Sequence, residues 1–465
     1  MSTDASPQPL PERTTAAPEG IFHRTYLLVT LGALALVFLA AFESLAVTTI
    51  MPLVSRELDG ASLYALAFAG PLATGVIGMV AAGNWSDRRG PAGPLYASVA
   101  LFVLGLLLAG TAETMTALLA GRLVQGLGGG AVTVALYVVV ARVFPPVLHP
   151  KIFAAFAAAW VVPSLVGPFA AGLVAQWLGW NWVFLGVVGL VVPAMLMIVP
   201  ALRGLPASQA GSRPWDYGRL AWAGLAALAV LGLNLSVEVP GAGWALAATA
   251  VAVALVAVRP LVPRGTLTAR RGLPAVILAR GLASAAFFGA EVYLPYLLVE
   301  RYVFSPTFAG LTLTGGALAW AGASAVQGRL GARLEHRRAV RIGSALVLGA
   351  VVLALATALL GWPAAVAITG WIFAGGGMGL MYPRLSVMTL ALSTKETEGF
   401  NSSAMSISDS LGGALALAAT GIVFAAFTTA AGGGAAPFAG VFALTAAIGV
   451  AGVLVAPRVA GQAAA

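Results

Sequence analysis

Cysteine is absent from the 465 residues of this sequence, so neither a disulfide bond nor a thiolate metal site can form. Histidine is scarce: His23, His149 and His336 fall in predicted tails or loops, without the spacing of metal ligands. The sequence also lacks a GxxxxGK[ST] phosphate-binding motif, and no triad-like set of residues converges on an apolar run. We therefore predict no enzyme activity, no bound metal or cofactor, and no use of ATP.

Charged residues are also scarce, at 9% of the chain against about 25% in a typical soluble domain, whereas 60% of the residues are hydrophobic. A chain of this composition cannot build a water-facing surface, so a membrane is its solvent. The net charge of +9 does not indicate nucleic-acid binding, because the basic residues stand between apolar runs. We predict an all-α membrane protein.

Apolar runs of about 17–25 residues are long enough for helices that cross a bilayer. Two sets of six such runs are separated by two weaker runs, 219–237 and 243–258. We favour two crossings by the weaker runs, which gives fourteen helices. If neither weaker run crossed the membrane, the later helices would have the same orientation as with two crossings. The stronger runs are 26–52, 61–82, 93–112, 116–142, 151–176, 181–202, 273–299, 306–326, 340–360, 363–391, 403–430 and 436–456.

Basic residues are distributed unequally between the two sides that these spans define. The loops of one side hold only Arg56 and Arg301. Because loops rich in Lys and Arg stay in the cytoplasm, we predict that the other side and both termini are cytoplasmic, in a multi-pass protein of the cell membrane. The basic residues of that side are Arg88, Arg89, Arg142, Lys151, Arg203, Arg213, Arg219, Arg259, Arg264, Arg270, Arg271, Arg329, Arg333, Arg337, Arg338, Arg341 and Lys395.

Four pairs of features recur at nearly the same separation, which indicates an internal repeat. They are Glu43 and Glu291, Gly83 and Gly328, Gly128–Gly130 and Gly375–Gly377, and Gly167-Pro168 and Gly412-Gly413. Parallel six-helix repeats are typical of transporters, with a binding site near the membrane midplane between them. We predict a disordered cytoplasmic tail (1–23), two six-helix bundles related by pseudo-two-fold symmetry (24–203 and 273–457), a linker with two additional transmembrane helices (204–272), and a cytoplasmic tail (458–465).

The loop GNWSDRRGP, from Gly83 to Pro91, combines glycines that permit a tight turn with an acid, Asp87. Asp87 can accept hydrogen bonds from the N-terminus of a neighbouring helix and pair with an arginine. The loop resembles the motif between helices two and three of the major facilitator superfamily. Over residues 24–456 the chain resembles a fourteen-helix drug–proton antiporter of that superfamily. The resemblance implies that Gly83, Asp87, Arg88 and Gly90 form a latch that closes the cytoplasmic side.

The loop departs from the family motif at two places. Trp85 stands where leucine is usual, and Pro91-Ala92 replace a trailing basic pair, which predicts a weaker latch. The alternative interpretation is a basic cytoplasmic loop without a gating role.

Arg122 lies inside an apolar run, in GRLVQGLGGG (Gly121 to Gly130), and a guanidinium there needs a partner or a hydrated cavity. The segment resembles the helix-four motif of the superfamily, which implies that Arg122 couples transport to proton movement. A snorkelling arginine at the membrane interface is the alternative. Gln125 is a candidate to line the substrate cavity.

The segment VPSLVGPFAAG, from Val162 to Gly172, resembles the helix-five motif of exporters in the same superfamily. Pro163 and Pro168 permit a kink, and Gly167 and Gly172 allow close packing against a neighbouring helix. The resemblance favours efflux and assigns Gly167, Pro168 and Gly172 to gating. A packing role alone is the alternative.

Glu43 lies near the middle of an apolar run, where a charge is costly. A carboxyl group away from water favours its neutral form, so Glu43 could take a proton from one side and release it to the other. The resembled family carries an aspartate at this spacing before Pro52, and a cationic substrate could displace the proton. The alternative is a permanently protonated acid that serves only as a hydrogen-bonding group.

Glu291 is the second acid within a predicted span, and Phe287, Phe288, Tyr293 and Tyr296 flank it. Aromatic faces beside a carboxylate suit a lipophilic cation, although the same aromatic residues could simply pack a helix. We assign Glu291 to proton coupling and all five residues, with Glu43 and Gln125, to substrate binding. Asp409 is expected to be an anion at the start of a helix.

These features together predict a proton-coupled exporter, or antiporter, of amphipathic or cationic small molecules such as drugs, working by alternating access. A lipid or glycolipid flippase on the same fold, or a proton-coupled uptake symporter, are the alternatives. The expected partners are a small-molecule substrate, protons and membrane lipids, without nucleic acid. The resemblance implies a monomer.

Overall fold

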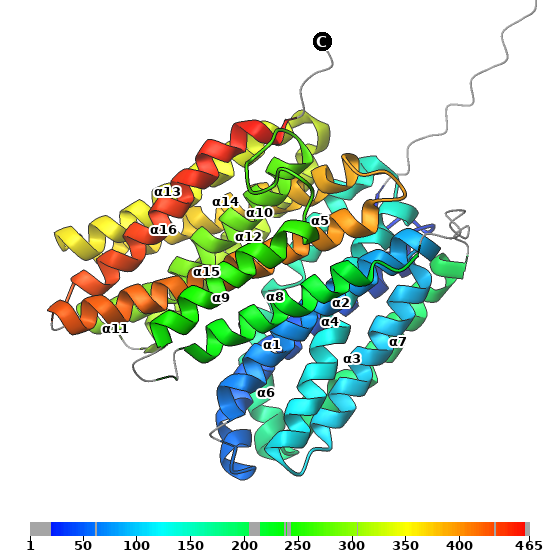
Figure 1. Cartoon of the computed structure of the whole chain (residues 1–465), viewed down its shortest axis with the longest axis horizontal. Helices are drawn as coiled ribbons and strands as arrows, with labels where there is room; N and C mark the ends of the chain where they lie inside the picture. Colours follow the sequence, from blue (N-terminus) through cyan, green and yellow to red (C-terminus); the bar gives the residue numbers. More distant parts are fainter. Residues whose placement is uncertain are drawn as a thin grey trace, which may run out of the picture.

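The described part of the chain consists of helices, without a strand, in the computed structural model (Figure 1). Twelve of these helices are long and apolar enough to cross a membrane, which confirms the predicted all-α membrane class. The predicted tails lie largely outside the described residues. These are 20–60, 63–203, 214–236, 239, 243–304, 306–431 and 434–460.

The first bundle forms from helices whose apolar faces share one core. Its helices are α1 (Leu27–Glu57), α2 (Tyr64–Arg89), α3 (Ala92–Gly110), α4 (Met115–Val143), α5 (His149–Ala158), α6 (Val161–Trp177) and α7 (Asn181–Arg203). Leu106 of α3 and Phe184 of α7 are fully buried in this core. Helix α4 packs against both α2 and α3, and α1 packs against α6 and α7.

The second bundle repeats this arrangement around its own core. Its helices are α10 (Leu273–Glu291), α11 (Tyr293–Tyr302), α12 (Pro306–Leu330), α13 (His336–Leu360), α14 (Ala364–Ala391), α15 (Glu398–Ala431) and α16 (Ala436–Val455). Trp371 and Phe442 are fully buried at its centre. Helix α14 packs against α12 and α13 as α4 packs against α2 and α3.

One span in each bundle is divided into two helices, and a proline explains each division. Pro163 lies four residues after Ala159, the residue that follows the end of α5, and Pro295 lies four residues after Glu291, where α10 ends. A proline has no N–H for the carbonyl four residues before it, and its ring clashes with that carbonyl. The division at Pro163 is where the sequence predicted a kink. The division at Glu291 was not predicted, and it places this acid at a helix end.

Two further helices, α8 (Tyr217–Leu235) and α9 (Gly243–Val258), follow the first bundle and pack against α2 and α15. The twelve candidate spans include Gly243–Leu261, whereas the apolar stretch of α8 is the shorter Tyr217–Leu233. That stretch rises about 25 Å, less than the hydrocarbon thickness of about 30 Å. The fourteen crossings predicted from sequence are therefore not established, and the described residues provide twelve candidate spans.

The two bundles converge at one end and diverge towards the other (Figure 1). At the converging end, Gly83 of α2 lies against the backbone of Gly399 in α15, and Gly328 of α12 lies against Ala154 in α5. Gly83 and Gly328 are one of the recurring pairs in the sequence. We call this end, where the bundles touch, the closed end.

Glycines of α4 and α14 pack against neighbouring helices in the same way, but two residues out of the register that the sequence predicted. A Cβ on Gly126 would collide with the backbone of Pro71 in α2, and a Cβ on Gly375 would collide with the backbone of Gly316 in α12. Gly128 likewise faces the backbone of α3, as Gly377 faces the backbone of α13. This correspondence supports the internal repeat that the sequence predicted.

Candidate functional site

Glu43 of α1 and Arg122 of α4 form a buried ion pair, with 2.5 Å between Oε1 and Nη1. Each side chain is only 8% exposed. Arg122 also donates to the side-chain oxygen of Gln125 (2.7 Å) and to the carbonyl of Ala67 in α2 (3.2 Å). The guanidinium is therefore neutralised and hydrogen-bonded away from water, which is how a buried charge is tolerated.

This geometry decides one interpretation that the sequence left open. The interfacial, snorkelling arginine is wrong, because Arg122 is buried against α1 and α2. The sequence singled out both residues but did not pair them.

The position of Arg122 follows from the local sequence of α4. The helix begins at Met115, and the Thr114 side chain caps it by accepting the N–H of Ala117. Gly121 then faces the backbone of Ala109 in α3 without room for a Cβ. Gly126 similarly faces Pro71 in α2. These close approaches fix the rotation of α4, which directs Arg122 towards α1.

Glu291 lies at the junction of α10 and α11, and no hydrogen bond or ion pair joins it to Glu43 or Arg122 within the described residues. The packing of Gly128 on α3 recurs at Gly377 on α13, and the same separation places Trp371 where Arg122 would recur. The second bundle therefore repeats the acid without its arginine. Glu291 and Glu43 are not equivalent sites, although both were predicted to couple protons.

The aromatic residues near Glu291 mostly pack against other aromatic side chains. Phe287 is 2% exposed, is stacked on Trp371 at 4.9 Å between ring centroids, and contacts Phe288 edge-on at 5.3 Å. This arrangement favours the packing alternative for Phe287. Tyr293 and Tyr296 both lie 5.3 Å from the ring of Phe424. Tyr296 is 43% exposed and remains available to a ligand.

Asp87 joins the two bundles at the closed end. Its carboxylate oxygens accept the backbone N–H groups of Gly399 (2.6 Å) and Phe400 (2.8 Å). These N–H groups belong to the first turn of α15, where the helix dipole favours a negative charge. Gly90, at φ +81°, ends α2 in a conformation that favours glycine and lets the chain turn after this contact.

The arginine that stabilises the closed end is not Arg88 but Arg142, which the sequence did not single out for this role. Arg142 at the end of α4 donates to Glu398 (2.6 Å) and to the carbonyl of Lys395. Arg88 instead lies over the ring of Trp215, 5.3 Å from its centroid. No local pattern distinguished Arg142 from other loop arginines, because its partner Glu398 is far along the chain.

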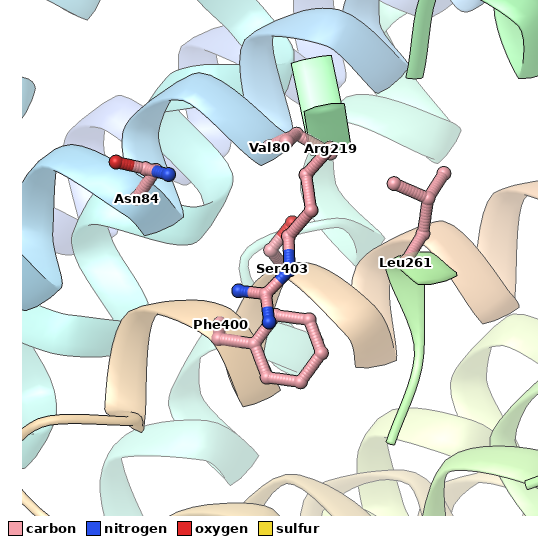
Figure 2. A pocket seen from close by; sticks show the side chains of 6 residues that line it. All are labelled: Val80, Asn84, Arg219, Leu261, Phe400 and Ser403. Atoms are coloured by element: carbon pink, nitrogen blue, oxygen red, sulfur yellow. The ribbon is translucent and has the colours of Figure 1, made fainter. Parts of the chain in front are cut away.

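The segment before α8 also contacts the closed end. Trp215 packs against Trp85, with 6.3 Å between ring centroids, so the tryptophan that replaces the usual leucine has a partner in the linker. Arg219 of α8 lies 4.0 Å from the ring centroid of Phe400 and forms an ion pair with Asp216 (3.0 Å). Figure 2 shows the Arg219 guanidinium above the Phe400 ring in a narrow pocket.

We expect Arg219→Ala to weaken the closed end modestly, by about threefold in the ratio of closed to open molecules, because an exposed cation–π contact contributes about 0.5–1 kcal/mol. Spin labels on Arg89→Cys and Arg341→Cys, both exposed and in opposite bundles, measure this ratio through their distance distribution. The exposed Arg271→Ala is the matched control. An unchanged distribution in Arg219→Ala would show that the linker does not stabilise this end.

The Pro/Gly segment of α6 differs from its predicted role. A Cβ on Gly167 would make ordinary contacts with Phe42 and Leu45 of α1, and a Cβ on Gly172 would meet nothing within 4 Å. The predicted close packing at these two glycines is therefore wrong for this conformation. The side chain of Pro168 lies outside the described residues.

Three charged groups within the helices of the second bundle were missed or misjudged from sequence. Asp409 was expected at a helix start but lies well inside α15, where Arg280 of α10 donates to it (3.1 Å). Arg384 of α14 donates to the carbonyls of Gln327 (2.9 Å) and Gly331 (2.7 Å), so it caps the end of α12. Arg280 and Arg384 lie within predicted apolar spans, and the reasoning applied to Arg122 would have identified both.

Comparisons with known proteins give one family. The model of the Major Facilitator Superfamily matches residues 33–417. The chain is 25% identical over 423 residues to the multidrug transporter protein MdtP of Bacillus subtilis, covering 87% of this chain and 76% of that protein. It is 32% identical over 163 residues to an uncharacterized transporter of Schizosaccharomyces pombe, covering 35% of this chain but 27% of that protein. The last match therefore spans less than a third of its relative.

Solved structures share the fold. The human organic anion transporter MFSD10 matches with a TM-score of 0.66 at 16% identity, covering 92% of this chain and 99% of that chain. The proton:xylose symporter XylE matches with a TM-score of 0.65 at 14% identity, covering 92% and 94%. At these identities the similarity concerns the fold alone.

Proposed function

Because the chain belongs to the Major Facilitator Superfamily, and is thus a multi-pass membrane transporter, we propose that it is a proton-coupled exporter of amphipathic or cationic small molecules. The observation that carries this proposal is the buried ion pair between Glu43 and Arg122. The relative MdtP is named a multidrug transporter, which supports export of drug-like molecules.

Coupling follows from the cost of leaving Arg122 unpaired. A proton on Glu43 neutralises the carboxylate and leaves the buried guanidinium without its counter-ion. Removing one partner of a buried pair costs about 3–5 kcal/mol, so protonation favours a rearrangement that hydrates Arg122 or gives it another partner. A cationic substrate competes with the proton for the same carboxylate. Because only one of them can bind at a time, substrate and proton are not transported together in the same direction.

Alternating access in this proposal consists of breaking the closed-end contacts while the opposite end closes. Asp87 and Arg142 of the first bundle would release the N-terminus of α15, so that the cavity opens at that end. Basic residues such as Arg89 and Arg341 indicate that the closed end faces the cytoplasm. A membrane potential of 100 mV would then add about 2.3 kcal/mol per proton moved inward.

The remaining parts of the proposal follow from sequence and resemblance. They are fourteen crossings, with α8 and α9 both spanning the membrane, cytoplasmic termini, residence in the cell membrane, contact with membrane lipids and a monomeric state. Tyr296, Phe288, Gln125 and Glu291 are proposed to contact substrate, with Gly83, Asp87, Gly90 and Gly167 acting in gating.

A lipid or glycolipid flippase is the second candidate, and one cavity favours it. A space of about 620 Å³ lies between α2, α4 and α8, lined mainly by leucine and alanine side chains, among them Leu66, Leu123 and Leu228. Such a lining suits an acyl chain. An uptake symporter has less support, because XylE shares only the fold.

Purified protein in vesicles that contain a pH-sensitive dye tests the proposal. With an imposed pH gradient, ethidium should move against the proton flow and each addition should release protons. Fluorescent lipid translocation without ethidium-linked proton movement would favour the flippase. Movement of neither protons nor ethidium would contradict the exporter.

A further inference from the structure

A second buried acid–arginine pair lies in the second bundle, apart from Glu43. Asp409 of α15 accepts hydrogen bonds from Arg280 of α10 (3.1 Å) and from the Tyr382 hydroxyl of α14 (2.8 Å). The Arg280 guanidinium lies 3.6 Å from the Tyr382 ring centroid, and it also donates to the carbonyl of Tyr382 (3.3 Å). Three helices of one bundle therefore converge on a single carboxylate.

The carboxylate is the accessible member of this pair. The side chain of Asp409 is 26% exposed and that of Arg280 is 9% exposed, whereas Glu43 and Arg122 are both 8% exposed. The side chain of Asp409 is therefore partly accessible in this conformation, while Arg280 stays covered. An acid that exchanges protons needs access to water in at least one conformation of the cycle, and in this one Asp409 is less covered than Glu43.

The two acids lie at different depths. Asp409 is eleven residues into α15 from its closed-end start at Glu398, a rise of about 16 Å. Glu43 is sixteen residues into α1 from Leu27, a rise of about 24 Å. Helix α1 also begins at the closed end, because Tyr26 just before it stacks on Phe144, the residue that follows α4. Asp409 is thus nearer the closed end than Glu43.

Asp409 also lies next to the contact between the bundles. Ile407 and Leu411 of α15 pack in a buried cluster with Val76 and Val80 of α2 and Ile277 of α10. This cluster joins the first bundle to the second, so a rearrangement of the bundles changes the surroundings of Asp409. The Tyr137 phenol of α4 interacts electrostatically with Arg280, so a side chain of the first bundle also acts on this pair.

We propose that Asp409 is a second proton-binding site of the transport cycle, with Arg280 and Tyr382 as its positioning residues; this rests on the proposed proton-coupled transport. A proton from one aqueous side converts the carboxylate to the neutral acid and leaves later to the other side. When the acid is neutral, Arg280 retains two contacts, one with the ring face of Tyr382 and one with the backbone carbonyl of the same residue. The pair can therefore titrate without stranding the cation.

The charged and titratable side chains around Asp409 are limited within the described residues. Arg280 comes from α10 and Tyr382 from α14, and Tyr137 of α4 acts on Arg280. The Ser386 hydroxyl accepts a hydrogen bond from Arg280 (3.4 Å) and carries no charge. The pH response of this site thus depends on one acid, one arginine and two phenols.

The test measures the number of protons exchanged per ethidium in vesicles, from the membrane potential that stops net flux at a fixed pH gradient. We expect Asp409→Asn to lower this ratio by one proton and to flatten the pH profile while transport continues. The exposed Glu300→Gln of α11 should keep the wild-type ratio. Tyr382→Phe should retain the ratio and change the pH profile, because it removes the hydroxyl that donates to the Asp409 carboxylate.

A wild-type proton ratio and pH profile in Asp409→Asn would overturn the proposal and leave a structural ion pair. If Asp409→Asn does not fold, Asp409→Asn with Arg280→Gln removes both charges and gives the same two outcomes. Failure of the proposed function is distinguishable, because the wild-type protein itself would then exchange no protons with ethidium.

Discussion

Glu43→Gln is expected to abolish ethidium export driven by a pH gradient, reducing it to the background of empty vesicles. Glutamine cannot exchange a proton, and it leaves Arg122 without a counter-ion in a site where both side chains are 8% exposed. The loss of one buried partner costs about 3–5 kcal/mol, so the thermal unfolding temperature should fall as well. Flux assays in vesicles and thermal unfolding in detergent measure the two effects separately.

A double variant separates coupling from stability. Glu43→Gln with Arg122→Gln removes both charges, so we expect it to recover much of the unfolding temperature and none of the proton-driven export. Glu113→Gln, which removes an exposed acid in the loop before α4, is the matched control and should behave as wild type. Gradient-driven export at the wild-type rate in Glu43→Gln would remove this acid from the mechanism.

Asp87→Ala is expected to open the closed end. It removes two hydrogen bonds from a carboxylate to the N–H groups of Gly399 and Phe400 at the start of α15. Hydrogen bonds to charged groups contribute about 1.5–3 kcal/mol each, so losing about 3 kcal/mol in total would shift the closed-to-open ratio by about a hundredfold. Net export should fall because the cavity remains open on this side.

The absence of cysteine makes this measurable without further substitutions of native thiols. Spin labels on Arg89→Cys and Arg341→Cys should report a longer distance in Asp87→Ala than in the parent. Arg142→Gln should move the distribution in the same direction, because it removes the donor to Glu398. Asp59→Asn is the control at the opposite end, where the positive φ of 48° tolerates asparagine. A distribution identical to the parent in Asp87→Ala would contradict the gating role.

At the closed end, one contact could be predicted from the sequence and two others could not. The glycines of GNWSDRRGP and the acid Asp87 were predicted to meet a neighbouring helix N-terminus, and Gly399 and Phe400 supply it. The choice of Arg142 over Arg88, and the contact of Trp85 with Trp215, could not be predicted. Both depend on where a distant segment passes, and no local pattern encodes that.

The sequence by itself determined the solvent, the helical class, the repeat and the presence of costly charges within spans, because each follows from composition or from periodic spacing along one chain. Tertiary structure alone decided that Glu43 pairs with Arg122, that Glu291 stands without a repeated arginine, and that Asp409 joins Arg280 and Tyr382. The physical reason is helix rotation: glycine contacts such as Gly121 with Ala109 set which face of each helix points inward. A rotation by one residue would direct each of these charges elsewhere.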